Sequence, residues 1–204
     1  MSLEFYLAYV VACIVIVIVP GPTVSLIVAN SIRYGTRAGL INIAGTQLGL
    51  AVMIAIVMVG LASLIETVGV WFDWVRLAGA AYLVWLGIKF LRAPAALGDS
   101  HGIPVPRGGF FLQGFLVLMS NPKALLLFGA FIPQFVDPAG DYIGQVLILG
   151  VTAMAVAGIF DSAYAVLTGR ARVLLSPPRV RIVSRLSGGF LIGGGVWLAF
   201  ARAR

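Results

Sequence analysis

The sequence predicts an all-α integral membrane protein, with six transmembrane helices arranged as two inverted three-helix repeats in a single transmembrane domain over residues 1–204. Two observations on composition predict this class. Hydrophobic residues make up 61% of the chain and charged residues only 10%, against roughly 25% in a soluble domain. The mean hydropathy of +1.07 is correspondingly high. So few charged side chains cannot cover a water-exposed surface, so we expect the chain to lie in a lipid bilayer.

Apolar segments of spanning length are the third observation. A spanning helix needs about 20 mostly apolar residues. Six segments meet or approach this length, and the third and last are the shortest: Leu3–Ile32, Ala38–Leu64, Trp74–Leu91, Phe110–Phe135, Tyr142–Thr168 and Ile182–Phe200. The N-terminus carries Glu4 where a secretory signal would carry lysine or arginine, and the apolar stretch after it runs past signal-peptide length, so we expect no cleavage.

The basic residues predict the orientation of these spans. The first, third and fifth connections are rich in lysine and arginine, comprising Arg33, Arg37, Lys89, Arg92, Arg107, Arg170, Arg172, Arg179, Arg181 and Arg185. The opposite side holds Arg76, Arg202 and Arg204. Because basic loops stay in the cytoplasm, both termini are predicted to face outward. The net charge of +7 is therefore a topology signal, and we expect no nucleic-acid partner.

The six spans divide into two halves of nearly equal length. We expect repeat 1 at about residues 1–92, a cytoplasmic loop at about 93–109 and repeat 2 at about 110–204. An odd number of spans in each half places the halves in opposite orientation. In transporters built this way, the substrate site lies near the bilayer midplane and is framed by interrupted helices.

Interruptions occur at matching places, in the first span of each half. They consist of Pro20, Gly21, Pro22 and Thr23 in the first half and of Asn121, Pro122 and Lys123 in the second. Proline frees backbone carbonyls in a medium without water, and these need partners from protein, substrate or trapped water. Thr23 and Ser25 are candidate partners at the first break, and Ser120 and Asn121 at the second. Either break alone is equally compatible with a simple proline kink, but two corresponding breaks favour a substrate site.

Two ionisable residues lie at predicted membrane depth, Lys123 and Asp161. Each costs roughly 2.5–3.5 kcal/mol at the centre of an isolated span, so such residues are functional candidates. We hypothesise that they pair or share a proton and couple transport to the proton gradient. A static salt bridge, or a Lys123 that reaches toward the membrane interface, is the alternative.

Polar and small residues in the second span are further candidates. Asn42 and Thr46 share one helical face with Gly45 and Gly49, whereas Gln47 points elsewhere. The candidate cavity-lining residues are Asn30, Asn42, Thr46 and Gln47. The Gly45/Gly49 pair and its counterpart Gly189/Gly193 have the G-x-x-x-G spacing of helix packing, and they suit contacts within one chain or between the subunits of a homo-oligomer equally well.

These residues carry a resemblance to a known family. The Pro20-Gly21-Pro22 break followed by Asn30, Gly35, Gly39, Gly45 and Gly49 resembles the amino-terminal signature of LysE/RhtB translocators, and Asn121-Pro122-Lys123-Ala124 resembles the second signature of that family. The resemblance implies a bacterial cytoplasmic-membrane exporter of amino acids or derivatives, such as lysine, threonine, homoserine or leucine, driven by proton antiport. Members commonly have asparagine where Thr23 follows the triplet here, which leaves the substrate subclass open.

The residues and the resemblance together predict a secondary active exporter that works by alternating access at a midplane site, with the lipid bilayer and an amino-acid-like substrate as its partners. An exporter of another metabolite or of a metal ion, a channel and a non-transporting scaffold are the alternatives. We expect no enzyme, because Ser25 and Ser162 have no evident base unless Lys123 serves as one. We expect no cofactor or metal site either, because Cys13 and His101 each occur alone in the sequence.

Overall fold

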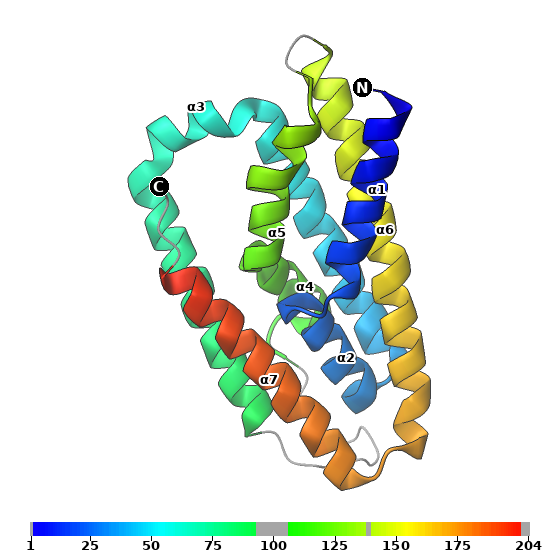
Figure 1. The fold of residues 1–204 in the computed structure, drawn as a ribbon. Helices are drawn as coiled ribbons and strands as arrows, with labels where there is room; N and C mark the ends of the chain where they lie inside the picture. Colours follow the sequence, from blue (N-terminus) through cyan, green and yellow to red (C-terminus); the bar gives the residue numbers. More distant parts are fainter. Residues whose placement is uncertain (1, 93–105, 138–139, 201–204) are drawn as a thin grey trace.

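The computed structural model of the chain describes residues 2–92, 106–137 and 140–200, except for the side chains of residues 60–73, 75, 130 and 173. The described chain is helical throughout, as expected, and its helices run roughly along one long axis (Figure 1). The elements are α1 (Leu3–Ile18), α2 (Pro22–Tyr34), α3 (Thr36–Leu91), α4 (Gly109–Met119), α5 (Pro122–Leu126), η1 (Leu127–Phe131), η2 (Ile132–Phe135), α6 (Tyr142–Ala171), η3 (Arg172–Leu174) and α7 (Pro177–Phe200).

Local sequence explains where several of these helices begin and end. Side-chain oxygens cap the first turns of α1, α5 and α6, where Ser2, Asn121 and Asp141 accept hydrogen bonds from backbone N–H groups two or three residues later. Gly35 separates α2 from α3 with a φ of 93°, a conformation that L side chains rarely adopt. A glycine is therefore required at this sharp junction.

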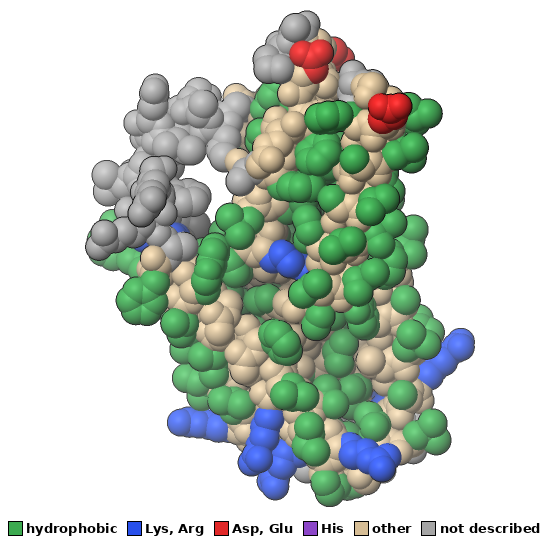
Figure 2. Space-filling view, viewed as in Figure 1, with side chains coloured by type: hydrophobic (Ala, Val, Ile, Leu, Met, Phe, Trp, Pro, Cys, Tyr) green, Lys and Arg blue, Asp and Glu red, His purple; other side chains and the backbone are tan. Residues whose placement is uncertain are grey.

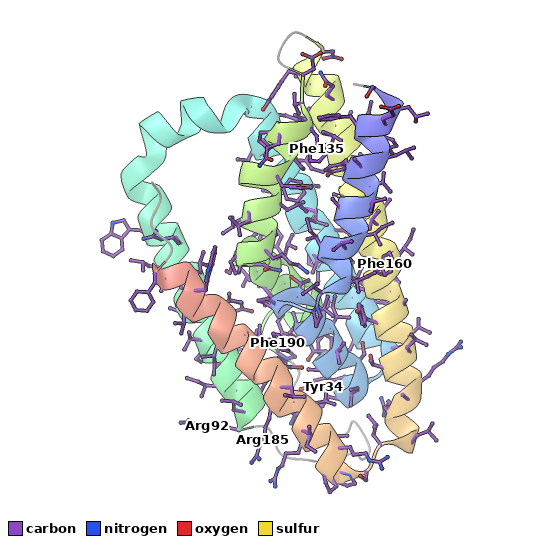
Figure 3. All side chains as sticks on the ribbon, viewed as in Figure 1. Tyr34, Arg92, Phe135, Phe160, Arg185 and Phe190 are labelled. Atoms are coloured by element: carbon purple, nitrogen blue, oxygen red, sulfur yellow. The ribbon has the colours of Figure 1, made fainter. Side chains whose placement is uncertain are left out.

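Both expected helix breaks are present. The pair α1 and α2 and the pair formed by α4 with Pro122–Phe135 are each bent by 51°. The first bent pair runs from the end that holds the N-terminus toward the opposite end, and the second runs back (Figures 1 and 3). The two bent pairs are therefore antiparallel.

The six expected spans are confirmed only in part. In the described residues, three helical segments are long and apolar enough to cross a membrane, namely Thr36–Val59, Tyr142–Ala171 and Pro177–Phe200, and the count reaches five if each bent pair is one span. The expected second and third spans, Ala38–Leu64 and Trp74–Leu91, belong to the continuous helix α3, which rises, curves over and descends beside α7 (Figure 1). Most of the expected loop at 93–109 lies outside the described residues, and α4 begins at Gly109.

Charged side chains separate toward the two ends of the molecule (Figure 2). Lysine and arginine gather at the end where α6 meets α7, which we call the basic end and which Figure 3 marks with Arg92 and Arg185. Acidic side chains lie at the opposite end, which we call the acidic end. Apolar side chains cover much of the surface between the two ends in Figure 2, as lipid contact requires.

Glycines allow the helices to pack closely. A Cβ at Gly45 would overlap the carbonyl oxygen of Phe111 in α4, and a Cβ at Gly114 would overlap that of Asn42 in α3. Gly49 packs against Leu118. In α7, however, a Cβ on Gly189 or Gly193 would meet nothing within 4 Å in the described structure, and Gly188, Gly194 and Gly195 make the close contacts instead. The packing stripe of α7 is therefore not the G-x-x-x-G pair expected from the sequence.

Candidate functional site

The first helix break leaves backbone carbonyls at the end of α1 without helical partners. Pro20 and Pro22 have no N–H, so the carbonyls four residues earlier, those of Ile16 and Ile18, cannot complete the helical pattern. Lys123 donates from Nζ to the Ile16 oxygen at 2.9 Å and also to the Val19 oxygen at 2.7 Å. The hydroxyl of Tyr164 in α6 donates to the Ile18 oxygen at 3.0 Å. Lys123 and Tyr164 thus take the place expected for Thr23 and Ser25.

The second break is satisfied locally and is bonded to the first. The Asn121 N–H donates to the Leu118 carbonyl at 2.9 Å, the carbonyl that Pro122 leaves free. The Asn121 side chain accepts from the Lys123 N–H at 3.0 Å and donates to the Thr23 hydroxyl at 2.6 Å. Two side chains of the second break, Asn121 and Lys123, therefore hold the first break in place.

Helix α7 packs against both breaks at one residue. A Cβ at Gly194 would lie 2.7 Å from Cγ of Pro22 and 3.8 Å from Cδ of Pro122. On another side of the first break, a Cβ at Gly21 would lie 3.7 Å from Cε of Lys123, so the lysine stem runs across this glycine. The two prolines, which are 100 positions apart in sequence, therefore meet at one point in the fold.

A cavity of about 60 Å³ lies where the two breaks meet. Helices α1 to α6 all contribute to its wall, through Ile16, Val17, Thr23, Val24, Thr46, Leu50, Leu118, Asn121, Lys123, Ala124, Ala157, Asp161 and also Leu127 of η1. One water molecule needs about 10–15 Å³ of such space, so the cavity has room for a few waters. A whole amino acid requires it to widen.

Asp161 is the acidic residue of this wall. It is 5% exposed, and in the described part of the chain no group donates a hydrogen bond to its carboxylate. Lys123 interacts with it electrostatically across the cavity, but directs its Nζ to the carbonyls of Ile16 and Val19. A buried carboxylate without a hydrogen-bond donor is costly, so an arriving cation or proton would be stabilised there.

The structure brings most of the predicted site residues together. Thr23, Thr46, Asn121, Lys123 and Asp161 line the cavity, and Pro20, Gly21, Pro22 and Pro122 form the breaks beside it. The other candidates lie elsewhere. Asn30 and Asn42 hydrogen-bond to each other in the protein interior, and Gln47 donates to the Met154 carbonyl at 3.1 Å, joining α3 to α6.

Two polar residues that the sequence analysis did not select belong to this region. Tyr164 lies three residues after Asp161, so helical spacing places both on one face of α6. Gln113 is a polar amide within the apolar segment Phe110–Phe135, and it is 5% exposed and bonded to Asn30. A search for every polar side chain within the predicted spans would have found both residues.

These features define a class of protein. Two antiparallel broken helices meet at a small cavity whose wall holds Lys123 and Asp161, inside a helical body with an apolar surface, and this arrangement is typical of secondary transporters. The sequence matches the family described as LysE type translocator over residues 14–202. The chain belongs to this family of membrane transporters.

Relatives of similar length agree with this assignment. The chain is 35% identical to a homoserine/homoserine lactone efflux protein of Salmonella typhi, over 99% of both chains. It is 33% identical to a Vibrio cholerae protein described as an uncharacterized membrane protein, over the full length of both. It is 31% identical to a leucine efflux protein of Salmonella typhimurium, over 80% of this chain and 78% of the relative. No solved structure matches the chain.

Proposed function

We propose that the protein is a secondary active exporter of amino acids across the bacterial cytoplasmic membrane. The observation that carries this proposal is the placement of Asp161 and Lys123 on the wall of one cavity at the meeting point of the two helix breaks. A zwitterionic amino acid needs one anionic and one cationic contact, and these two side chains could supply them. The efflux proteins among the relatives, named for homoserine and leucine, support the same substrate class.

The cavity wall suggests how a zwitterion would lie. The free oxygens of Asp161 suit the substrate ammonium, while Lys123 and the first turn of α2 suit its carboxylate, because a helix N-terminus carries partial positive charge. The remaining wall is mostly aliphatic. Asp161 is the one acidic residue among the described lining residues, so a second ammonium on the substrate would find no counter-charge. We therefore infer a neutral amino acid with a small or aliphatic side chain.

The antiparallel breaks support alternating access as the transport mechanism. Their equal bends of 51° and opposite directions support two inverted repeats, in which the curved helix α3 supplies two of the six crossings. The basic end would face the cytoplasm by the positive-inside rule, and both termini would face outward. The substrate would enter from the basic end and leave at the acidic end.

Proton coupling is the remaining part of the proposal. Asp161 has no donor in the described structure and lies near an ammonium group, so it can hold either a proton or a substrate cation. Competition between the two for one carboxylate would link outward substrate movement to inward proton movement. The pairing of Lys123 with Asp161 would then change during transport, as Lys123 moves away from the α1 carbonyls.

Export from proteoliposomes tests the function directly. Vesicles loaded with labelled amino acids, with and without an imposed proton gradient, would be compared for the native protein and Lys123→Met. Lys89→Met is the matched control, because Lys89 is exposed and stacks 4.1 Å over the Trp85 ring, away from the cavity. We expect saturable, gradient-dependent efflux of neutral amino acids that Lys123→Met abolishes and Lys89→Met retains. Equal flux in all three proteins would remove Lys123 from the mechanism, and flux that does not saturate would indicate a channel.

A further inference from the structure

Three buried amide side chains form a cluster, which we call the amide cluster, outside the cavity wall. Asn30 of α2 donates from Nδ2 to Asn42 Oδ1 of α3 at 2.8 Å and to Gln113 Oε1 of α4 at 2.9 Å. Asn42 donates onward to the Phe110 carbonyl at 2.6 Å. The three side chains are 1%, 0% and 5% exposed. One side chain of α2 thus bonds simultaneously to both neighbouring helices.

The amide cluster lies between the cavity and the basic end. Asn30 is seven residues beyond the cavity-lining Thr23 in the direction of Arg33, and on α3 Asn42 precedes the cavity-lining Thr46 by one turn. At 1.5 Å per residue these intervals correspond to roughly 6–10 Å along the helix axes. None of the three amides lines the cavity. The cluster therefore lies between the cavity and the basic end, at a level separate from the cavity wall.

Aromatic side chains, rather than amides, lie on the opposite side of the cavity. Tyr9 is fully buried, and its ring lies 5.9 Å from Phe131 and 5.2 Å from Phe135 between ring centroids. Phe135 lies near the acidic end (Figure 3). An aromatic cluster thus lies toward the acidic end, whereas the hydrogen-bonded amide cluster lies toward the basic end. The two clusters can be altered independently.

Packing indicates which helix moves when the amide cluster opens. Gly45 and Gly114 hold α3 and α4 in backbone contact, and this pair carries the two amide acceptors. The donor, Asn30, belongs to α2. Beside it, the Ser31 hydroxyl is buried and has no hydrogen-bond partner in the described structure. An unpaired buried hydroxyl destabilises the closed position of α2, and the Asn30 hydrogen bonds offset that cost.

We propose that the amide cluster is the gate that closes the cavity toward the basic end, and that α2 opens it by withdrawing Asn30 from Asn42 and Gln113. The three amides are positioning residues, because they set the position of α2 without touching the cavity. This proposal rests on the proposed alternating-access function, but its test needs no transported substrate. An open gate is detected by the entry of a water-soluble reagent.

The test measures entry into the cavity from each side of the membrane. Ala157→Cys places a thiol on the cavity wall, in a background where the buried Cys13 is replaced by alanine. Inverted and right-side-out vesicles are treated with a membrane-impermeant methanethiosulfonate reagent, and the labelling rate is measured. A cysteine at the exposed Arg181 identifies which vesicles present the basic end. The gate variants are Asn30→Leu and the milder Gln113→Leu.

Gln145→Leu is the matched control. Gln145 is likewise a buried amide, at 8% exposure, with hydrogen bonds to the backbone of Asp137 and Asp141, but it lies near the acidic end. We expect both gate variants to raise the labelling rate of the cavity cysteine from the basic end by at least about tenfold, and Gln145→Leu to leave that rate unchanged. Labelling from the acidic end should not rise in the gate variants.

The possible outcomes separate this proposal from the proposed function. An equal rise from both ends would indicate general loosening and overturn the gate, as would no rise from the basic end in folded Gln113→Leu protein, judged by its elution as a single species in detergent. If side-specific labelling occurs but no amino acid is transported, the gate stands and the proposed substrate is wrong.

Discussion

The crossing of α7 with α3 makes the sharpest stability prediction, because two adjacent glycines should respond in opposite ways to the same substitution. A Cβ at Gly188 would lie 2.7 Å from the Gly87 carbonyl oxygen and 3.1 Å from Cγ of Leu91. Real Cβ atoms essentially never approach closer than 3.0 Å, so α7 must move away by at least 0.3 Å. A Cβ at Gly189 would meet nothing within 4 Å in the described structure.

The magnitudes follow from these contacts. Overpacking typically costs about 1–3 kcal/mol, and the better helix propensity of alanine offsets up to about 1 kcal/mol of this, so Gly188→Ala should lower the free energy of unfolding by up to about 2 kcal/mol. Gly189→Ala should leave it unchanged or raise it by up to about 1 kcal/mol, because alanine is the better helix former. In a chain of this length each kcal/mol corresponds to about 2–4 °C in Tm. The two variants should therefore melt at least about 2 °C apart, with Gly188→Ala the lower.

Thermal unfolding in detergent, followed by tryptophan fluorescence, measures the difference. Two variants on one helix share the same expression, detergent and reference state, so the comparison isolates the contact with α3. Equal melting temperatures, or a lower value for Gly189→Ala, would show that the α3–α7 crossing is not as described.

Three further substitutions test the surroundings of the site, the first two by the same unfolding measurement and the third by export. Tyr164→Phe should lower the free energy of unfolding by about 1–3 kcal/mol, because the Ile18 carbonyl has no helical partner and would lose its remaining hydrogen-bond donor. Tyr9→Phe should cost less, about 1 kcal/mol, because the Leu149 carbonyl lies inside α6 and keeps its helical bond. A larger loss of unfolding free energy in Tyr9→Phe than in Tyr164→Phe would contradict the conclusion that the Ile18 carbonyl lacks a helical partner. Gly194→Val should abolish export, because its side chain would push apart the two prolines at the breaks; normal export in that variant would show that the breaks tolerate separation.

The helix breaks are features of the fold that local sequence predicts. Proline interrupts a helix wherever it stands, since it has no N–H and its ring clashes with the preceding turn. The bends at Pro20–Pro22 and at Pro122 were therefore predictable, and both are 51° in the structure. Their antiparallel arrangement also followed from the count of spans, although the structure joins the expected second and third spans within α3.

The continuity of α3 was not predictable from hydropathy. Glu66 and Asp73 lie between the two expected spans and favour a connection at the membrane surface. No proline lies between Leu64 and Trp74, however, so nothing local forces the backbone hydrogen bonds to end. The helix curves over instead of breaking (Figure 1).

The site likewise combines features that the sequence determines with contacts that only the tertiary structure creates. Sequence alone determined the membrane class, the two proline breaks, the segregation of basic residues and the two ionisable residues at membrane depth, because each follows from residue type and short-range spacing. Only the tertiary structure decided that Lys123 bonds to the carbonyls of α1 while facing Asp161 across a cavity, that Tyr164 serves the same break, and that Asn30 joins Gln113. These are contacts between helices that are distant in sequence, and they depend on the packing of the whole body rather than on any local pattern.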